Sequence, residues 1–192
     1  MTLNEIIIAS LSQMDRGHDP QTLEKWRAKF TRFANDAILD LAVAFKPLRR
    51  ENAKLSGSVL DTATLERPCI KVENILKDGF PLRHSPVDAS GIISVRGVGE
   101  VTVVYQYMPR ELKRPSETPE LPEHLHPLIV LYVTARERMS GDVSTQKGAN
   151  LYMQLYEAGK ARILSGTQPA REINNKFLTP ENSYESVVGV EL

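Results

Sequence analysis

Over the first 46 residues, hydrophobic positions recur every three or four residues, the spacing of one face of an α-helix. The first apolar run comprises Leu3, Ile6, Ile7 and Leu11. Thr2 and Glu5 form the Thr-x-x-Glu pattern of a capping box at its start. This spacing predicts a short helix that ends near residues 15–17.

A second helix is predicted from Asp19-Pro20, which supply a cap and a first-turn proline, to Pro47, which ends it. Its apolar stripe is Leu23, Trp26, Phe30, Phe33, Ala37, Ile38, Leu41 and Phe45. This stripe is expected to pack against Leu128, Tyr132 and Leu155 of a later helix pair and to form the main core.

The pattern changes from residue 48 to 108, where glycines and prolines separate short β-branched runs. The runs at 69–72, 92–95 and 100–107 predict strands of a small antiparallel sheet. The segment 96–99 predicts a hairpin turn between the last two strands, and Asp78-Gly79 predicts another turn. Residues 110–119 are expected to form a solvated linker because they contain two prolines and several charges.

Two further helices are predicted at 121–139 and 145–164, separated by a short break at 140–142. The predicted fold class is α+β, mainly α: a helical bundle with an inserted antiparallel sheet and an extended C-terminal tail. The predicted organisation is helices at 1–46, the β insert and linker at 47–119, the helix pair at 120–165 and the tail at 166–192.

Composition narrows the function classes. The 192 residues carry 24 basic and 24 acidic side chains, so the net charge is zero. A free-standing nucleic-acid binder usually has a basic excess, which disfavours that class. The first ten residues lack the basic start of a secretion signal, and no apolar run is long enough to cross a bilayer. We therefore expect a soluble protein that is intracellular at synthesis.

No catalytic, cofactor or metal site is predicted. His124 and His126 with Glu123 are spaced wrongly for a helical ligand pair, so a polar first turn is expected there. Gly97-Val98-Gly99 precedes a strand, which excludes a phosphate-binding loop. Cys69, the only cysteine, is expected to be a buried thiol.

His18 and His84 are expected on the surface. The carboxylates expected to face solvent are Asp36, Asp40 and Glu137. The tyrosines expected in core or interface positions are Tyr105, Tyr107, Tyr132, Tyr152 and Tyr156.

A basic cluster surrounds the predicted end of the second helix, and its residues are Lys46, Arg49, Arg50 and Lys54. One interpretation is a solvated edge whose charges prevent the sheet from pairing with other chains. The other is a basic rim that faces DNA or an acidic neighbouring subunit.

Four segments carry a resemblance to a known family: 33–41, Pro47-Leu48-Arg49-Arg50, Leu121-Pro122-Glu123 and 150–158. Over 3–46 and 120–165 the chain resembles the head-to-tail adaptor (head completion or connector) proteins of tailed bacteriophages. The resemblance implies a structural virion protein in the phage neck, assembled in the host cytoplasm. It implies a ring of about twelve copies beneath the portal, which extends the DNA channel and docks the tail or stopper.

Family members often use a terminal extension to grip the portal or a neighbouring subunit, and 166–192 is the segment that fits this role. Its apolar residues are Phe177, Leu178, Tyr184, Val187, Val188 and Val190. These residues are expected to become buried in a partner as an added strand or as groove anchors.

Three other interpretations stay open. The chain could be another neck or tail component, such as a stopper or tail terminator, although those are mostly β proteins. It could be a small β module that binds a ligand or an oligonucleotide and carries helical arms. A hydrolytic enzyme is the weakest interpretation because the sequence shows no nucleophile, base or metal constellation.

Overall fold

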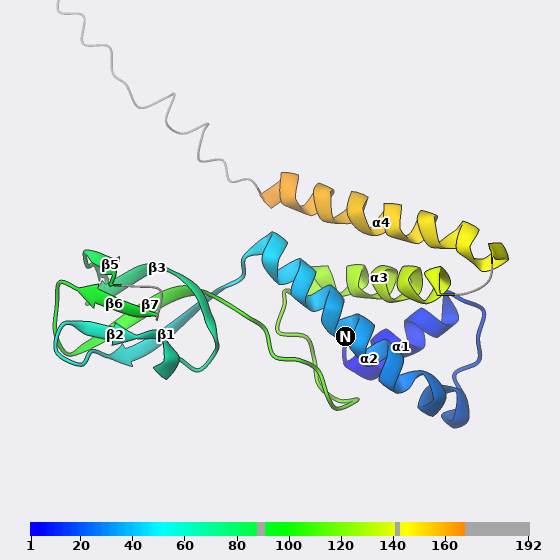
Figure 1. Cartoon of the computed structure of the whole chain (residues 1–192), viewed down its shortest axis with the longest axis horizontal. Helices are drawn as coiled ribbons and strands as arrows, with labels where there is room; N and C mark the ends of the chain where they lie inside the picture. Colours follow the sequence, from blue (N-terminus) through cyan, green and yellow to red (C-terminus); the bar gives the residue numbers. More distant parts are fainter. Residues whose placement is uncertain (88–90, 141–142, 168–192) are drawn as a thin grey trace, which may run out of the picture.

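The structure of the chain, a computed structural model, describes residues 1–87, 91–140 and 143–167. It is a mixed helical and β protein whose sheets are antiparallel. The helices gather at one end of the molecule and the strands at the other (Figure 1). No helix in the described ranges has the length and apolar character of a membrane span.

Local signals set the ends of the first two helices. The α1 helix spans Leu3–Ser12 and begins with the predicted reciprocal capping box between Thr2 and Glu5. The α2 helix spans Pro20–Phe45; Asp19 caps its N-terminus by accepting hydrogen bonds from the Gln21 and Thr22 amides. Lys46 ends α2 in a left-handed conformation, with φ of 49°. The predicted positions of both helices are confirmed.

The helices share one core. A 3₁₀ turn at Glu123–Leu125 leads into α3 (His126–Met139), which packs against α1, α2 and the long α4 helix (Val143–Thr167). Phe30 and Leu41 of α2 are fully buried beside Ile129 and Val133 of α3. Packing between α2 and the first helix of the later pair is therefore confirmed.

The predicted contribution of Leu155 to this core is wrong. Leu155 is 47% exposed, and the neighbouring Tyr156 is buried in its place. A shift of one residue rotates a side chain by about 100° around a helix, which moves Leu155 to the outer face of α4.

The β part contains two small antiparallel sheets around a second core. The strands are β1 (Leu48–Lys54), β2 (Val59–Asp61), β3 (Cys69–Lys77), β4 (Phe80–Pro81), β5 (His84–Pro86), β6 (Ile92–Val95) and β7 (Glu100–Tyr107), with a 3₁₀ turn at Thr62–Thr64. One sheet has the order β1-β7-β3-β4 and the other the order β2-β6-β5.

The predicted hairpin between β6 and β7 is wrong, because these strands lie in different sheets. Both edges of β7 are occupied, by β1 along its length and by β3. The segment 96–99 instead carries the chain from one sheet to the other. The turn at Asp78-Gly79 is confirmed: both residues have positive φ, 51° and 85°, and they join β3 to β4.

Most of the segment 110–119 between β7 and α3 is exposed, as expected for a solvated linker, but hydrogen bonds tie it to the helices. The amide of Leu3 donates to the Glu117 carbonyl at 2.8 Å. Asn35 and Leu112 exchange two hydrogen bonds of 2.8 and 3.0 Å, and the Leu112 side chain is buried. Backbone hydrogen bonds therefore fasten this segment to α1, and the Asn35 side-chain amide fastens it to α2. The local charge pattern does not reveal these long-range contacts.

Candidate interaction site at the helix–sheet junction

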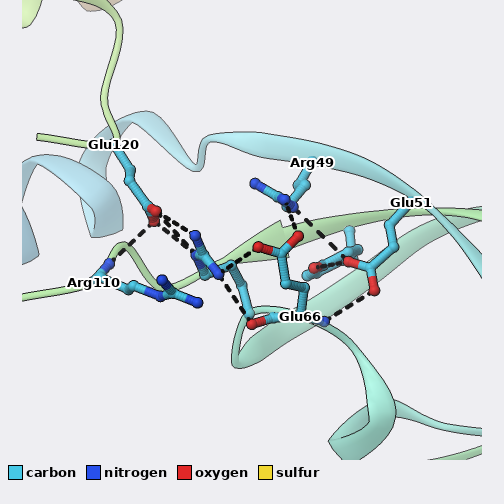
Figure 2. A network of polar contacts seen from close by, with 7 residues as sticks. Arg49, Glu51, Glu66, Arg110 and Glu120 are labelled. Carbon is cyan, nitrogen blue, oxygen red and sulfur yellow. Dashed lines mark hydrogen bonds and ion pairs between the residues drawn. The ribbon is translucent and has the colours of Figure 1, made fainter.

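A network of charged side chains joins the β part to the segment that enters α3 (Figure 2). Arg67 lies between the 3₁₀ turn at Thr62–Thr64 and β3, and its side chain is only 7% exposed. Its Nε donates to both carboxylate oxygens of Glu120, at 2.9 and 3.1 Å. Its Nη1 donates to Oε1 of Glu66 at 2.9 Å. The buried guanidinium therefore has acceptors on two sides.

Glu120 is held from three directions. Besides Arg67, the amide of Arg110 donates to its carboxylate at 3.2 Å. The Tyr107 hydroxyl donates to the Glu120 carbonyl at 2.6 Å. The hydrogen bonds from Arg67 lower the pKa of Glu120, so this carboxyl stays ionised below its ordinary range. The end of β7 and the entry to α3 are thereby fixed together.

The network continues on the inner face of β1. Arg49 forms ion pairs with Glu66 and Glu51. The Tyr105 hydroxyl donates to Glu51 at 2.7 Å, and the Glu66 amide donates to the same carboxylate at 2.9 Å. Burial, followed by the hydrogen bond from the Tyr105 hydroxyl to Glu51, raises the pKa of Tyr105 to about 12. Tyr105 thus stays protonated and acts as a donor.

The basic cluster proposed from sequence is split by the strand geometry. Successive side chains of a strand point to opposite faces. Arg49 therefore faces the network and is neutralised, whereas Arg50 and Lys54 lie exposed on the outer face. Lys46 is also exposed, at the end of α2, and Lys54 lies opposite Glu100 of β7. The rim consists of Lys46, Arg50 and Lys54 without Arg49.

The histidine prediction needs one correction. His124 is exposed, but His126 is fully buried rather than part of a polar turn. The Met1 amino group donates to His126 Nδ1 at 2.8 Å, which leaves Nε2 to donate to the Leu121 carbonyl at 3.0 Å. Burial lowers the pKa of His126. Within the described ranges, no group of three or more His, Cys, Asp or Glu side chains could hold a metal ion.

Two of the three carboxylates expected in solvent have partners from other elements. Glu137 is buried and pairs with Arg16 at 3.2 Å and Lys29 at 2.5 Å. Asp40 accepts from Tyr156 and from Lys160 Nζ at 2.9 Å. Partial burial would raise the pKa of Asp40, but these hydrogen bonds outweigh it and the pKa is lowered. Asp36 is half-buried. The pattern of one helix does not show the cations that other elements supply, here the α1–α2 connection, α2 and α4.

Cys69 is half-buried rather than fully buried, and burial raises the pKa of its thiol. It lies in a groove of about 440 Å³ between β3 and the strands β5 and β6. Of the tyrosines, Tyr105 and Tyr156 are fully buried, and Tyr107, Tyr132 and Tyr152 are partly buried. His18 is exposed and His84 is half-buried.

The predicted docking residues of the tail, from Phe177 to Val190, lie outside the described residues. Sequence reasoning missed Arg67 and Glu120, which are 53 residues apart and belong to no periodic pattern. No family model matches the chain, and no curated protein matches it either.

Proposed function

We propose that the chain is a head-to-tail adaptor of a tailed bacteriophage. Several copies form a ring beneath the portal, extend the DNA channel and provide a docking surface for the tail or stopper. The observation that carries this proposal is the shared helical core. The segments 3–46 and 120–165, to which the resemblance extends, come together around one set of buried side chains, although the β part separates them in sequence.

The charged junction supports the same role. An adaptor holds two large assemblies in a fixed arrangement, so its own parts need a fixed relative orientation. Arg67, which is buried, and Glu120, which is partly buried, supply an ion pair between the β part and the start of the helix pair. Such pairs favour one arrangement because a displaced partner would leave a charge buried without compensation.

In this proposal the tail at 166–192 grips the portal or a ring neighbour through its apolar residues. The rim formed by Lys46, Arg50 and Lys54 faces DNA in the channel or an acidic neighbouring subunit. DNA passes without sequence-specific binding, and the chain itself carries out no reaction and holds no cofactor.

The experiment is co-sedimentation with tailless, DNA-filled heads of the phage that encodes the chain. The full chain should sediment with portal-bearing heads and not with heads lacking the portal. A chain ending at Gly166 should fold, as shown by circular dichroism, and fail to sediment. Full attachment of this truncation would move the docking surface to the helices or the β part. No attachment of the full chain would refute the adaptor function.

The groove beside β3 favours one alternative, a small β ligand-binding module. Its volume of about 440 Å³ lies within the range of small-molecule sites, and its lining includes Ile70, Val72 and Ile92. A module of this kind should remain monomeric and bind a ligand, whereas a ring component, including a stopper or tail terminator, should oligomerise or bind a neighbour. Solution mass with and without portal separates these classes.

A further inference from the structure

Two helical faces are partly exposed in the described structure, and the first belongs to α2. One side of this face borders a small groove that Asp36 and Leu39 line together with residues 108–111. Leu39 and Val43 are 48% and 60% exposed, one helical turn apart on the side opposite the core. Asp36 lies one turn before Leu39 on the same side and is half-buried. Asp36 forms no ion pair within the described ranges. We call Asp36, Leu39 and Val43 the α2 face.

The second uncovered face belongs to α4. Leu151 and Leu155 are 56% and 47% exposed, and Ala158 and Arg162 continue their stripe toward the C-terminal end of the helix. The nearby Glu157 is already paired with Lys160 at 3.1 Å. Arg162, like Asp36, has no ion-pair partner among the residues described. We call Leu151, Leu155, Ala158 and Arg162 the α4 face.

An outer helical surface of a soluble protein is normally polar, with charges opposite the core stripe. The α4 face instead presents two leucines and an alanine, and the exposed positions beside it are Asn150, Gln154, Glu157 and Ala161. Apolar residues grouped into one exposed patch mark a protein–protein contact more often than the same residues scattered singly. Both α2 and α4 pack on α3 (Figure 1), so their outer faces are directed away from the shared core.

The two faces are complementary when the helices run antiparallel. Seven residues separate Asp36 from Val43, and seven separate Arg162 from Leu155. At a rise of about 1.5 Å per residue, both intervals are about 10.5 Å. Asp36 then lies opposite Arg162, Leu39 beside Ala158, and Val43 opposite Leu155. The charges are opposite and the apolar residues meet, with a small residue facing a leucine.

We propose that the α2 face of one copy binds the α4 face of a second copy, with the helices antiparallel. The two faces differ, so each copy keeps one free face after a single contact. Such a head-to-tail contact repeats and produces a ring where the rotation closes. The proposal rests on the proposed function and names the surfaces that would join the ring.

The test uses Val43→Glu and Leu155→Glu, each placing a charge on one face at an exposed position that the fold tolerates. Val98→Glu is the matched control, since Val98 is 59% exposed and lies outside both faces. Sedimentation velocity over a concentration series should show wild type and the control associating beyond the dimer. Each face variant should associate at least about tenfold more weakly. Circular dichroism checks that all variants are folded.

Mixing the two face variants decides between a head-to-tail contact and other arrangements. The Leu155→Glu copy keeps an intact α2 face, and the Val43→Glu copy keeps an intact α4 face. An equimolar mixture should therefore form dimers that contain one copy of each and grow no further. A monomeric mixture, a monomeric wild type at every concentration, or unchanged association of either variant would overturn the proposal.

Charge reversal gives an independent check. Asp36→Arg or Arg162→Asp alone should weaken association at least about tenfold, and the chain carrying both changes should recover it. Attachment of wild type to portal-bearing heads is measured separately. If the chain associates as described but does not attach to the heads, the adaptor function alone is refuted. If it attaches to the heads but the two variants form no mixed dimer, the interface alone is refuted.

Discussion

Replacing Arg67 by Met tests whether the charged junction holds the two parts of the molecule together. The substitution keeps most of the apolar stem and removes the guanidinium, which is 7% exposed, while its partner Glu120 is 27% exposed. Breaking a buried ion pair costs about 3–5 kcal/mol, and a hydrogen bond to a charged group contributes about 1.5–3 kcal/mol. Water reaches the freed Glu120 carboxylate in part, so we expect a loss of about 2–3 kcal/mol.

The free energy of unfolding is measured by urea titration at pH 7, with far-UV circular dichroism for the whole chain. Trp26 is the only tryptophan and packs against the helical core, so its fluorescence reports that core. In wild type the two transitions should coincide. In Arg67→Met the circular dichroism transition should begin at a lower urea concentration, because the β part loses its fastening to the helices.

The pH dependence of the stability difference between wild type and Arg67→Met shows whether the ion pair is its cause. Arg67 lowers the pKa of Glu120 below its ordinary value of 4.5, so this stabilisation is present above that pH and is lost as the pH falls through the lower folded pKa. The difference between wild type and Arg67→Met should therefore shrink below about pH 4.5. A loss under about 0.5 kcal/mol at pH 7, or a larger loss that does not change with pH, would show that the pair does not fasten the junction.

Three further outcomes are expected. Phe33→Ala should lower the free energy of unfolding by about 3–5 kcal/mol in urea titrations, because Phe33 is buried in the helical core; wild-type stability would contradict this. Dialysis against a chelator should leave the thermal midpoint and the association unchanged, and unfolding would show that a metal had been overlooked at His124 or elsewhere. Iodoacetamide should alkylate Cys69 more slowly than a free thiol at pH 8, since burial raises the pKa of Cys69, and mass spectrometry would expose faster labelling.

The parts of the fold that depend on neighbouring residues were predictable from sequence. Thr2 and Asp19 bond to amides within three residues, and the turn at Asp78-Gly79 needs only two residues with positive φ. The interactions that form these caps and this turn are made within the segment itself, so its residues are enough to predict them. For the same reason, the long helix from Pro20 to Phe45 was located almost to the residue.

The remaining features arise from segments that are distant in sequence. The strand β6 does not pair with β7 because β1 and β3 already flank β7, a competition that no local turn signal reveals. Glu137 is buried, and its charge is neutralised by Arg16 and Lys29, which belong to other elements. Within α4, Leu155 and Tyr156 are both apolar enough for the core, and only the packing against α2 and α3 decides which one enters it.

The chain leaves and re-enters the helical part at nearly the same place. The strand that begins the β part, β1, is hydrogen-bonded to the strand that ends it, β7, and the Tyr107 amide donates to the Pro47 carbonyl at 3.3 Å. An insert with adjacent ends can be gained, lost or exchanged without moving the flanking helices. The β part is therefore a replaceable module: a short loop from Pro47 to Met108 should preserve the helical core, and a reporter domain could be carried at the same position.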